Sequence, residues 1–166
     1  MDGNSCTACD YKLVDLQLTT VSLRPSAAGL YFTGSFDIAR DVEVARRGIV
    51  VSVYNALPVA DGSDPGSLWT KGTTSVLIKN ILSDKVEDSS NQNRAAMPIY
   101  ARAYVELADG SYIYGDVVEV NLRQVVEMVD ARLSLLSVSQ KDAITDMYVK
   151  FKNVLDTWDV PNLKAY

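Results

Sequence analysis

Apolar and polar residues alternate through most of the chain ahead of its last third, a pattern that predicts β-strands. The clearest run covers residues 30–38. One face of it carries Leu30, Phe32 and Phe36, and the other carries Tyr31. A period of two places one face of a strand against a core and the other in water. Further strands are predicted at residues 12–24, 49–54, 68–70, 75–78 and 97–120.

The strand over residues 12–24 changes phase along its length. Its first half has Val14 and Leu16 on one face, and its second half has Val21 on the other face. The change falls at Thr19–Thr20. It predicts either a bulge or a passage of the strand from one sheet to a second one.

Residues 97–120 are predicted to form a hairpin whose turn is Asp109-Gly110, two residues with the composition of a type I′ turn. That turn pairs Leu107 with Tyr112, and the same register places Tyr114 inward with the apolar residues. The outward face carries Tyr100, Arg102, Tyr104 and Glu106. The register would also bury the carboxylate at position 116, so a bulge at Gly115–Asp116 is predicted to turn it outward.

Beyond Val120 the period changes from two to 3.6, which predicts helices. A first apolar stripe runs from Val125 to Leu136. A second helix is predicted to have its N-cap at Ser139 and to end before Pro161. Its apolar face carries Ile144, Met147, Tyr148, Phe151, Val154, Leu155 and Trp158.

These elements predict a mainly β fold, an antiparallel β-sandwich followed by a C-terminal two-helix hairpin. The polar run over residues 84–94 has the composition of a long exposed loop. The expected divisions are a flexible N-terminus at 1–11, a sandwich domain at 12–121, the helical hairpin at 122–160 and a C-terminal tail at 161–166.

The predicted hairpin also resembles a known family. Residues 99–105 form a tyrosine-flanked strand, Asp109-Gly110 forms a short turn, and residues 114–118 begin a valine-containing last strand. These features are similar to the last two strands of fibronectin type III and immunoglobulin-like modules. In place of the core tryptophan usual in fibronectin type III modules, this chain has Phe32 or Phe36. The resemblance implies an immunoglobulin-like sandwich and a role in a bacterial surface or phage structural protein.

The composition excludes several classes of function. The net charge is −5, and an acidic surface is a poor partner for nucleic acid and for anionic lipid. No run approaches the ~20 apolar residues that a membrane span needs. The chain contains no histidine, the usual base for serine and cysteine nucleophiles and the usual ligand of catalytic zinc. We therefore expect neither an enzyme nor a cofactor. With no secretory signal visible, the compartment stays open, with a cell surface or virion favoured.

Two groups of residues have the chemistry to bind a metal. Cys6 and Cys9 have the spacing of redox pairs and half zinc sites. No βαβ unit follows them and no further cysteine completes a zinc site, so a lightly pinned N-terminus or a local disulfide is preferred over a shared metal. Asp61 and Asp64 share a polar loop without the spacing of an EF-hand, and a solvated loop is preferred over a calcium site.

The sequence thus predicts a non-enzymatic structural or adhesion/assembly module that acts through protein–protein contacts or self-association. The alternative is a carbohydrate-binding accessory module that stacks sugars on exposed aromatic rings. The residues expected to contact a partner are Tyr100, Arg102, Tyr104, Trp69, Tyr54, Phe151 and Trp158.

Overall fold

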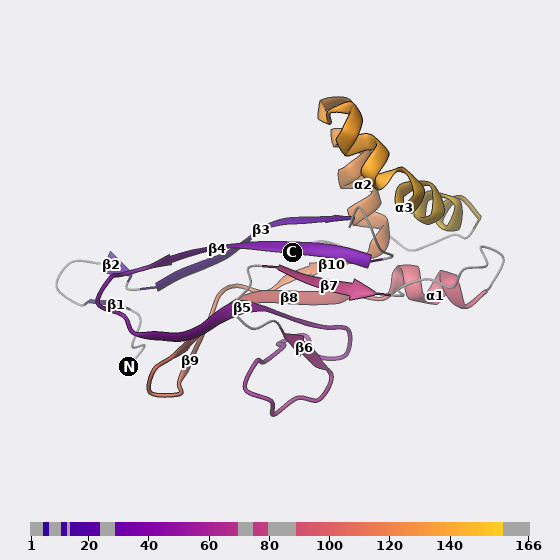
Figure 1. Cartoon of the computed structure of the whole chain (residues 1–166). Coiled ribbons are helices and arrows are strands. Elements are labelled where there is room, and N and C mark those ends of the chain that lie inside the picture. Colours follow the sequence, from indigo (N-terminus) through magenta and orange to yellow (C-terminus); the bar gives the residue numbers. More distant parts are fainter. Residues whose placement is uncertain are drawn as a thin grey trace. The chain divides into compact units, whose positions relative to one another are not determined.

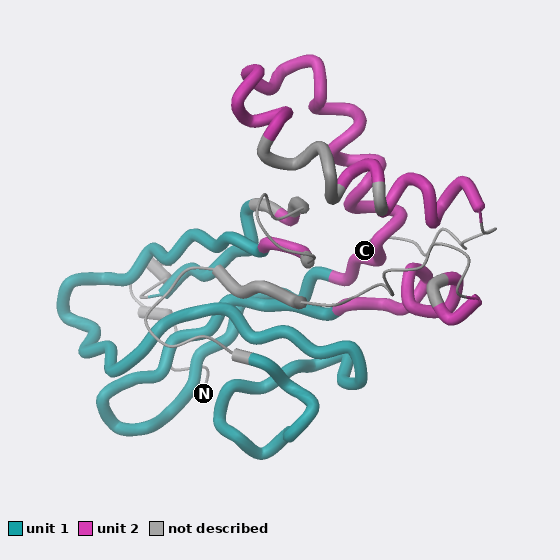
Figure 2. Tube along the Cα trace, turned by 45° about the vertical axis from the view of Figure 1, so that its right-hand side comes forward, with its two compact units in different colours: residues 1–20, 32–76, 100–118 teal, residues 21–31, 77–99, 119–166 magenta. Residues whose placement is uncertain are grey.

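Figure 1 shows the computed structural model of the chain, which describes residues 5–6, 11–12, 14–23, 29–69, 75–79 and 89–157. The chain divides into two compact units, which Figure 2 colours separately. Unit 1 comprises residues 1–20, 32–76 and 100–118, and unit 2 comprises residues 21–31, 77–99 and 119–166. Each unit therefore combines stretches that lie far apart along the chain.

The strands and their pairing confirm a mainly β chain with antiparallel sheets. The strands are β1 (Ser5–Cys6), β2 (Tyr11–Lys12), β3 (Val14–Leu23), β4 (Gly29–Ile38), β5 (Val44–Ser52), β6 (Ser67–Trp69), β7 (Ser75–Lys79), β8 (Ile99–Leu107), β9 (Tyr112–Tyr114) and β10 (Val118–Val120). One sheet has the order β3-β4-β7, and the other has the order β10-β8-β5-β6, with β9 also paired to β8. In the stretch predicted to be a flexible N-terminus, β1 pairs with β2.

Both larger sheets contribute to one buried cluster in unit 1. Its members are Val14 and Leu16 from β3 and Ala103 and Val105 from β8. The partly buried residues packed against it are Phe36, Ile38, Val42, Leu107 and Ile113. Ser35 and Asp37 between the core positions of β4 are exposed, so the predicted alternation in this strand is confirmed.

The predicted change of phase in the first long strand coincides with a boundary in the fold. β3 is continuous, but its residues up to Thr20 belong to unit 1 and those from Val21 belong to unit 2. Leu16 is buried before the boundary and Val21 after it. Because the two ends of β3 belong to different units, they bury opposite faces.

The register of the β8–β9 hairpin differs from the predicted one by one residue. Tyr104 pairs with Tyr114, and the N–H of Leu107 donates to the carbonyl oxygen of Ser111 at 2.8 Å. The connection is therefore one residue longer than a type I′ turn. Gly110 has a φ of 83°, the left-handed conformation that closes a three-residue hairpin loop.

This shift of one residue turns every side chain of the second strand to the other face. The prediction that Tyr112 and Tyr114 face inward is therefore wrong. Both lie on the same face as Tyr104, and Ile113 points to the core cluster instead. The strand ends at Tyr114, and Asp116 is exposed. The observed register explains this exposure without the predicted bulge, because the N–H of Gly115 still bonds to Ala103 in that register.

The end of β9 at Tyr114 also allows a close approach between two strands. Gly115 donates its N–H to the carbonyl oxygen of Ala103 at 3.0 Å. A Cβ added at Gly115 would overlap the carbonyl oxygen of Leu16 and lie 3.1 Å from the Cβ of Leu16. The sequence therefore has glycine where the backbone of β3 leaves no room for a side chain.

The helices belong to unit 2. They are α1 (Ser90–Ala96), α2 (Leu122–Arg132), the 3-10 turn η1 (Leu133–Leu135) and α3 (Val138–Thr157). The prediction of an exposed loop over residues 84–94 is wrong for its last part, which belongs to α1. This helix has a polar sequence, but Ala95 is buried and α1 contacts both α2 and α3. Tertiary packing rather than local propensity therefore stabilises so short a helix.

Local hydrogen bonds define where the two longer helices begin. Asn121 caps α2, because its side chain accepts from the N–H of Gln124 at 3.0 Å and the side chain of Gln124 accepts from the N–H of Asn121 at 2.9 Å. Ser137 and Gln140 make the same pair of bonds before α3. The cap of α3 is therefore Ser137, two residues earlier than the predicted Ser139.

One polar contact links the two longer helices. The hydroxyl of Tyr148 in α3 donates to Asp130 in α2 at 2.7 Å. This bond, with burial and the charge of Asp130, raises the pKa of Tyr148 to about 12. On the predicted apolar face of α3, Phe151 and Val154 are buried. Trp158 and Pro161 lie outside the described residues.

Candidate functional site

The face of the β5-β8-β9 sheet opposite the core cluster, here called the outer face, is not open to solvent. It has a buried cluster of its own, formed by Val50, Ala60 and Tyr104. Ala60 belongs to the connection between β5 and β6, residues 53–66, which we call the covering loop. The covering loop therefore occupies part of the surface on which the sequence predicted partner contacts.

Three tyrosines of the outer face, Tyr104, Tyr112 and Tyr114, form what we call the tyrosine row. The ring centroids of Tyr104 and Tyr112 are 6.2 Å apart, and those of Tyr112 and Tyr114 are 6.0 Å apart with an interplanar angle of 13°. These separations are typical of favourable aromatic pairs. Burial raises the pKa of Tyr104 and of Tyr114, so both hydroxyls stay neutral at physiological pH.

Two arginines contact the tyrosine row. The guanidinium carbon of Arg102 lies 3.8 Å from the ring centroid of Tyr114, a cation–π contact. Arg46 forms an ion pair with Glu106 and donates from Nη2 to the hydroxyl of Tyr112 at 3.2 Å. Loss of hydration lowers the pKa of Arg102, whereas the hydrogen bond with Glu106 raises that of Arg46.

The tyrosine row and Arg102 hold the covering loop on the sheet. Arg102 donates from Nε to the carbonyl oxygen of Pro58 at 2.7 Å. The backbone N–H of Ala60 donates to the hydroxyl of Tyr114 at 3.0 Å. Hydrogen bonds to a charged or partly buried group are among the stronger ones in proteins. The outer face thus serves to position the loop.

The two ends of the covering loop are joined through Ser52, a buried residue. Its Oγ accepts from the N–H groups of Tyr54 at 3.2 Å and Asn55 at 3.1 Å. The same oxygen donates to the carbonyl of Gly66 at 3.2 Å. A single hydroxyl therefore satisfies backbone groups at the start and at the end of the loop, which restricts its conformations.

Asp64 forms a second junction inside the loop. Its carboxylate accepts from Ser67 Oγ at 2.7 Å, from Asn55 Nδ2 at 3.0 Å and from the N–H of Gly66 at 2.9 Å. These bonds, that from Ser67 foremost, hold the pKa of Asp64 below its ordinary value. The carboxylate is thus engaged within the loop. Among the described residues, no group of three or more acidic or cysteine side chains is arranged to hold a metal ion.

Acidification is expected to loosen the covering loop. Because the pKa of Asp64 is lower in the folded state, its contribution is present above the unfolded value of about 4 and is lost as pH falls through the folded pKa. The side-chain amide resonances of Asn55, followed by NMR through an acid titration, should shift below about pH 4. In Asp64→Asn this transition should vanish, and its persistence there would assign it to another carboxyl.

The covering loop presents two large hydrophobic side chains to solvent. Tyr54 is 83% exposed and Leu57 is 62% exposed. The backbone beneath them is fixed, since the N–H of Tyr54 donates to Ser52 and that of Leu57 donates to the side chain of Asn55 at 2.9 Å. A loop with a fixed backbone and exposed apolar side chains is suited to contact another macromolecule.

The structure corrects the predicted contact residues at two positions. Tyr104 is only 1% exposed because the covering loop lies over it, and Phe151 is 0% exposed within the helices of unit 2. Neither can touch a partner. Arg102 and Tyr100 are half-buried, and Arg102 binds the covering loop. Among the predicted contact residues whose side chains the structure describes, Tyr54 is the one that is largely exposed.

The remaining predicted contact residues are tryptophans. The backbone of Trp69 pairs with Val50 at the edge of the sheet. The side chain of Trp69 and the whole of Trp158 lie outside the part of the chain that the structure describes. Leu57 was not predicted, although an apolar residue in a loop rich in polar residues and proline could have drawn attention to it.

Within the described residues, no helix is both long and apolar enough to cross a membrane.

Comparison with known proteins finds no relative of this chain. No family model, no curated protein and no solved structure matches the chain, so its function has to be inferred from its own residues.

Proposed function

We propose that the chain is a non-enzymatic structural or adhesion/assembly module of a bacterial surface or a phage virion, and that it acts through protein–protein contacts of the covering loop. The observation that carries this proposal is the exposure of Tyr54 and Leu57 on a loop fixed by Ser52 and Asp64. A preorganised loop loses little conformational entropy on binding. Exposed tyrosines are common anchors of protein interfaces.

We also propose that the fold is an immunoglobulin-like, fibronectin III-like antiparallel sandwich with a C-terminal two-helix hairpin. The cluster shared by β3, β4 and β8 supports face-to-face packing of two sheets. The hydrogen bond between Tyr148 and Asp130 supports a packed pair of helices. Modules of this kind often serve as rigid carriers for loops that bind other proteins.

The test of the contact role is self-association of the full chain, measured by sedimentation velocity at a series of concentrations. The double variant Tyr54→Ser/Leu57→Ser is expected to raise the dissociation constant about tenfold or more, since truncating an interface anchor costs more than about 1 kcal/mol. The matched control is Leu135→Ser, because Leu135 is 81% exposed and lies in unit 2. Association that is equally strong in the double variant would refute the role of the loop.

The carbohydrate-binding alternative relies on the same exposed ring of Tyr54. A sugar stacks on an aromatic face without needing Leu57, so the two functions respond differently to single changes. Glycan binding by the wild-type chain that is lost in Tyr54→Ser and kept in Leu57→Ser would favour the alternative. Failure to bind any glycan on an array would leave protein contact as the function of the loop.

A further inference from the structure

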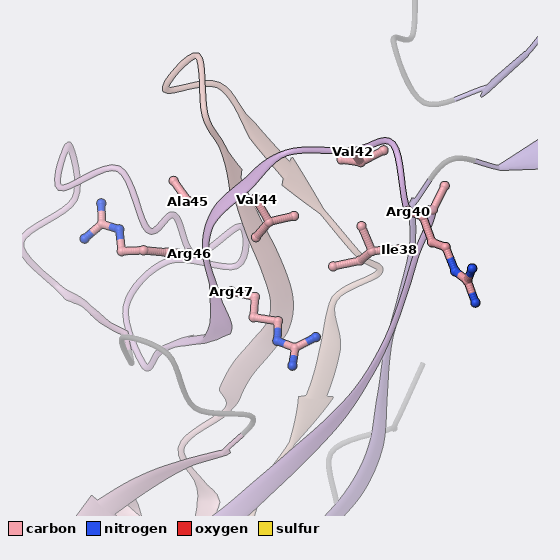
Figure 3. A pocket seen from close by; sticks show the side chains of 8 residues that line it. Ile38, Arg40, Val42, Val44, Ala45, Arg46 and Arg47 are labelled. Atoms are coloured by element: carbon pink, nitrogen blue, oxygen red, sulfur yellow. The ribbon is translucent and has the colours of Figure 1, made fainter.

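A shallow hollow lies at the turn between β4 and β5 in unit 1 (Figure 3), with a volume of about 420 Å³. Its apolar lining is Ile38, Val42 and Val44 with two alanines, and its remaining lining is Arg40, Arg46 and Arg47. Binding pockets in proteins commonly have volumes of about 300–1,000 Å³. The hollow therefore combines an apolar surface with cationic groups.

Arg40 and Arg47 give the hollow a positive charge. Both are exposed, and no carboxylate among the described residues forms an ion pair with either. The guanidinium carbon of Arg47 lies 5.6 Å from the ring centroid of Phe36. Asp41 and Glu43 alternate with the lining residues and do not line the hollow. The charged residues that line the hollow are therefore all cationic, in a chain whose net charge is −5.

The third arginine has a structural role in the hollow. Arg46 is held by Glu106 and by the hydroxyl of Tyr112 in the tyrosine row. These two contacts therefore fix the position of the Arg46 guanidinium. Figure 3 shows the side chains of Arg40 and Arg46 on opposite sides of the apolar residues, with Arg47 between them.

The covering loop has the complementary chemistry. Leu57 is exposed, and four residues further along the loop Asp61 is exposed as well. The N–H and the hydroxyl of Ser63 donate to Oδ1 of Asp61 at 2.9 and 2.6 Å. These bonds hold the pKa of Asp61 below its ordinary value, so the carboxylate is charged at neutral pH.

We propose that the covering loop of one copy docks into the hollow of a second copy, with Leu57 against its apolar lining and Asp61 beside Arg40 and Arg47. This inference rests on the proposed function, because it uses the same loop. Two cationic hollows repel each other, whereas a hollow and an acidic loop attract. Contact between two different surfaces repeats head to tail and builds a ring or a filament rather than a two-fold dimer.

Two variants of the full chain test this geometry when they are mixed. The hollow variant is Arg40→Glu/Arg47→Glu, and the loop variant is Leu57→Ser/Asp61→Asn. Each alone is expected to self-associate at least about tenfold more weakly than the wild type. An equimolar mixture should restore association, because one copy supplies an intact loop and the other an intact hollow. The mixture should stop at a heterodimer in sedimentation velocity, since neither variant can extend the chain.

The control variant is Arg94→Glu/Arg132→Glu, which makes the same change in net charge at exposed arginines of unit 2. It should associate as the wild type does, and equal weakening in it would overturn the proposal by assigning the effect to overall charge. A mixture that stays monomeric would also overturn it. The loop variant could weaken association while the hollow variant does not. That result would overturn the docking geometry but would leave the proposed function intact. A wild-type chain that is monomeric at every concentration would overturn the docking of one copy into another.

Discussion

Replacing Tyr104 by alanine is expected to lower the free energy of unfolding by about 3–5 kcal/mol, the usual cost of removing a buried aromatic side chain. Tyr104 lies at the centre of the outer-face cluster, between Val50 and Ala60, and its ring is packed against Tyr112. Its removal leaves a cavity under the covering loop. Denaturation in guanidinium chloride, followed by circular dichroism, measures the loss.

The control for Tyr104→Ala is Tyr54→Ala, the same substitution at an exposed ring. This change is expected to alter stability by less than about 0.5 kcal/mol, as surface substitutions usually do. The two variants therefore distinguish Tyr104, which stabilises the loop from beneath, from Tyr54, which the loop exposes to solvent. Equal stability losses in both variants would show that the covering loop does not bury Tyr104 in solution.

Replacing Gly115 by alanine is expected to destabilise the chain by about 3 kcal/mol, the upper end of the usual cost of forcing an extra methyl group into a packed site. The new Cβ would overlap the carbonyl oxygen of Leu16. A flexible side chain could move aside, but this atom belongs to the backbone of β3 and cannot. Thermal and chemical denaturation of the variant would both show the loss.

Gly62→Ala separates this steric effect from the general effect of losing a glycine. Gly62 has a φ of 82°, and no atom lies within 4 Å of the position of its added Cβ. The expected loss there is about 1–2 kcal/mol, from the left-handed backbone alone. A loss at Gly115 no larger than at Gly62 would contradict the close approach of β3.

The faces of individual strands could be read from the sequence, but the register between strands could not. Alternation within β4 depends only on its own residues, so the positions of Phe32 and Phe36 were predicted correctly. The register of β8 and β9 depends on the length of their connection, and Asp109-Gly110 suits connections of two or three residues. The predicted register left Ile113 facing solvent and needed a bulge to turn Asp116 away from the core, two costs that the observed register removes.

The candidate site was partly predictable for a related reason. Tyr104 was correctly placed on the outward face of β8, but the outward face is covered. What covers it depends on contacts between distant residues, such as Arg102 with Pro58 and Tyr114 with Ala60. The local sequence pattern of a strand does not predict such contacts. The same limit applies to Phe151, whose apolar face was predicted while its burial partners were not.

The division of the chain into interleaved stretches has a consequence for its synthesis. Unit 1 receives its last stretch at residues 100–118, and unit 2 requires the segment that begins at residue 119. β3 and β4 are therefore synthesised before the later stretches of their units. Their apolar residues stay exposed on the nascent chain until most of it has been translated. Folding that depends on such distant pairings is slow and vulnerable to aggregation. Production of this protein should therefore respond strongly to chaperones and to lower temperature during translation.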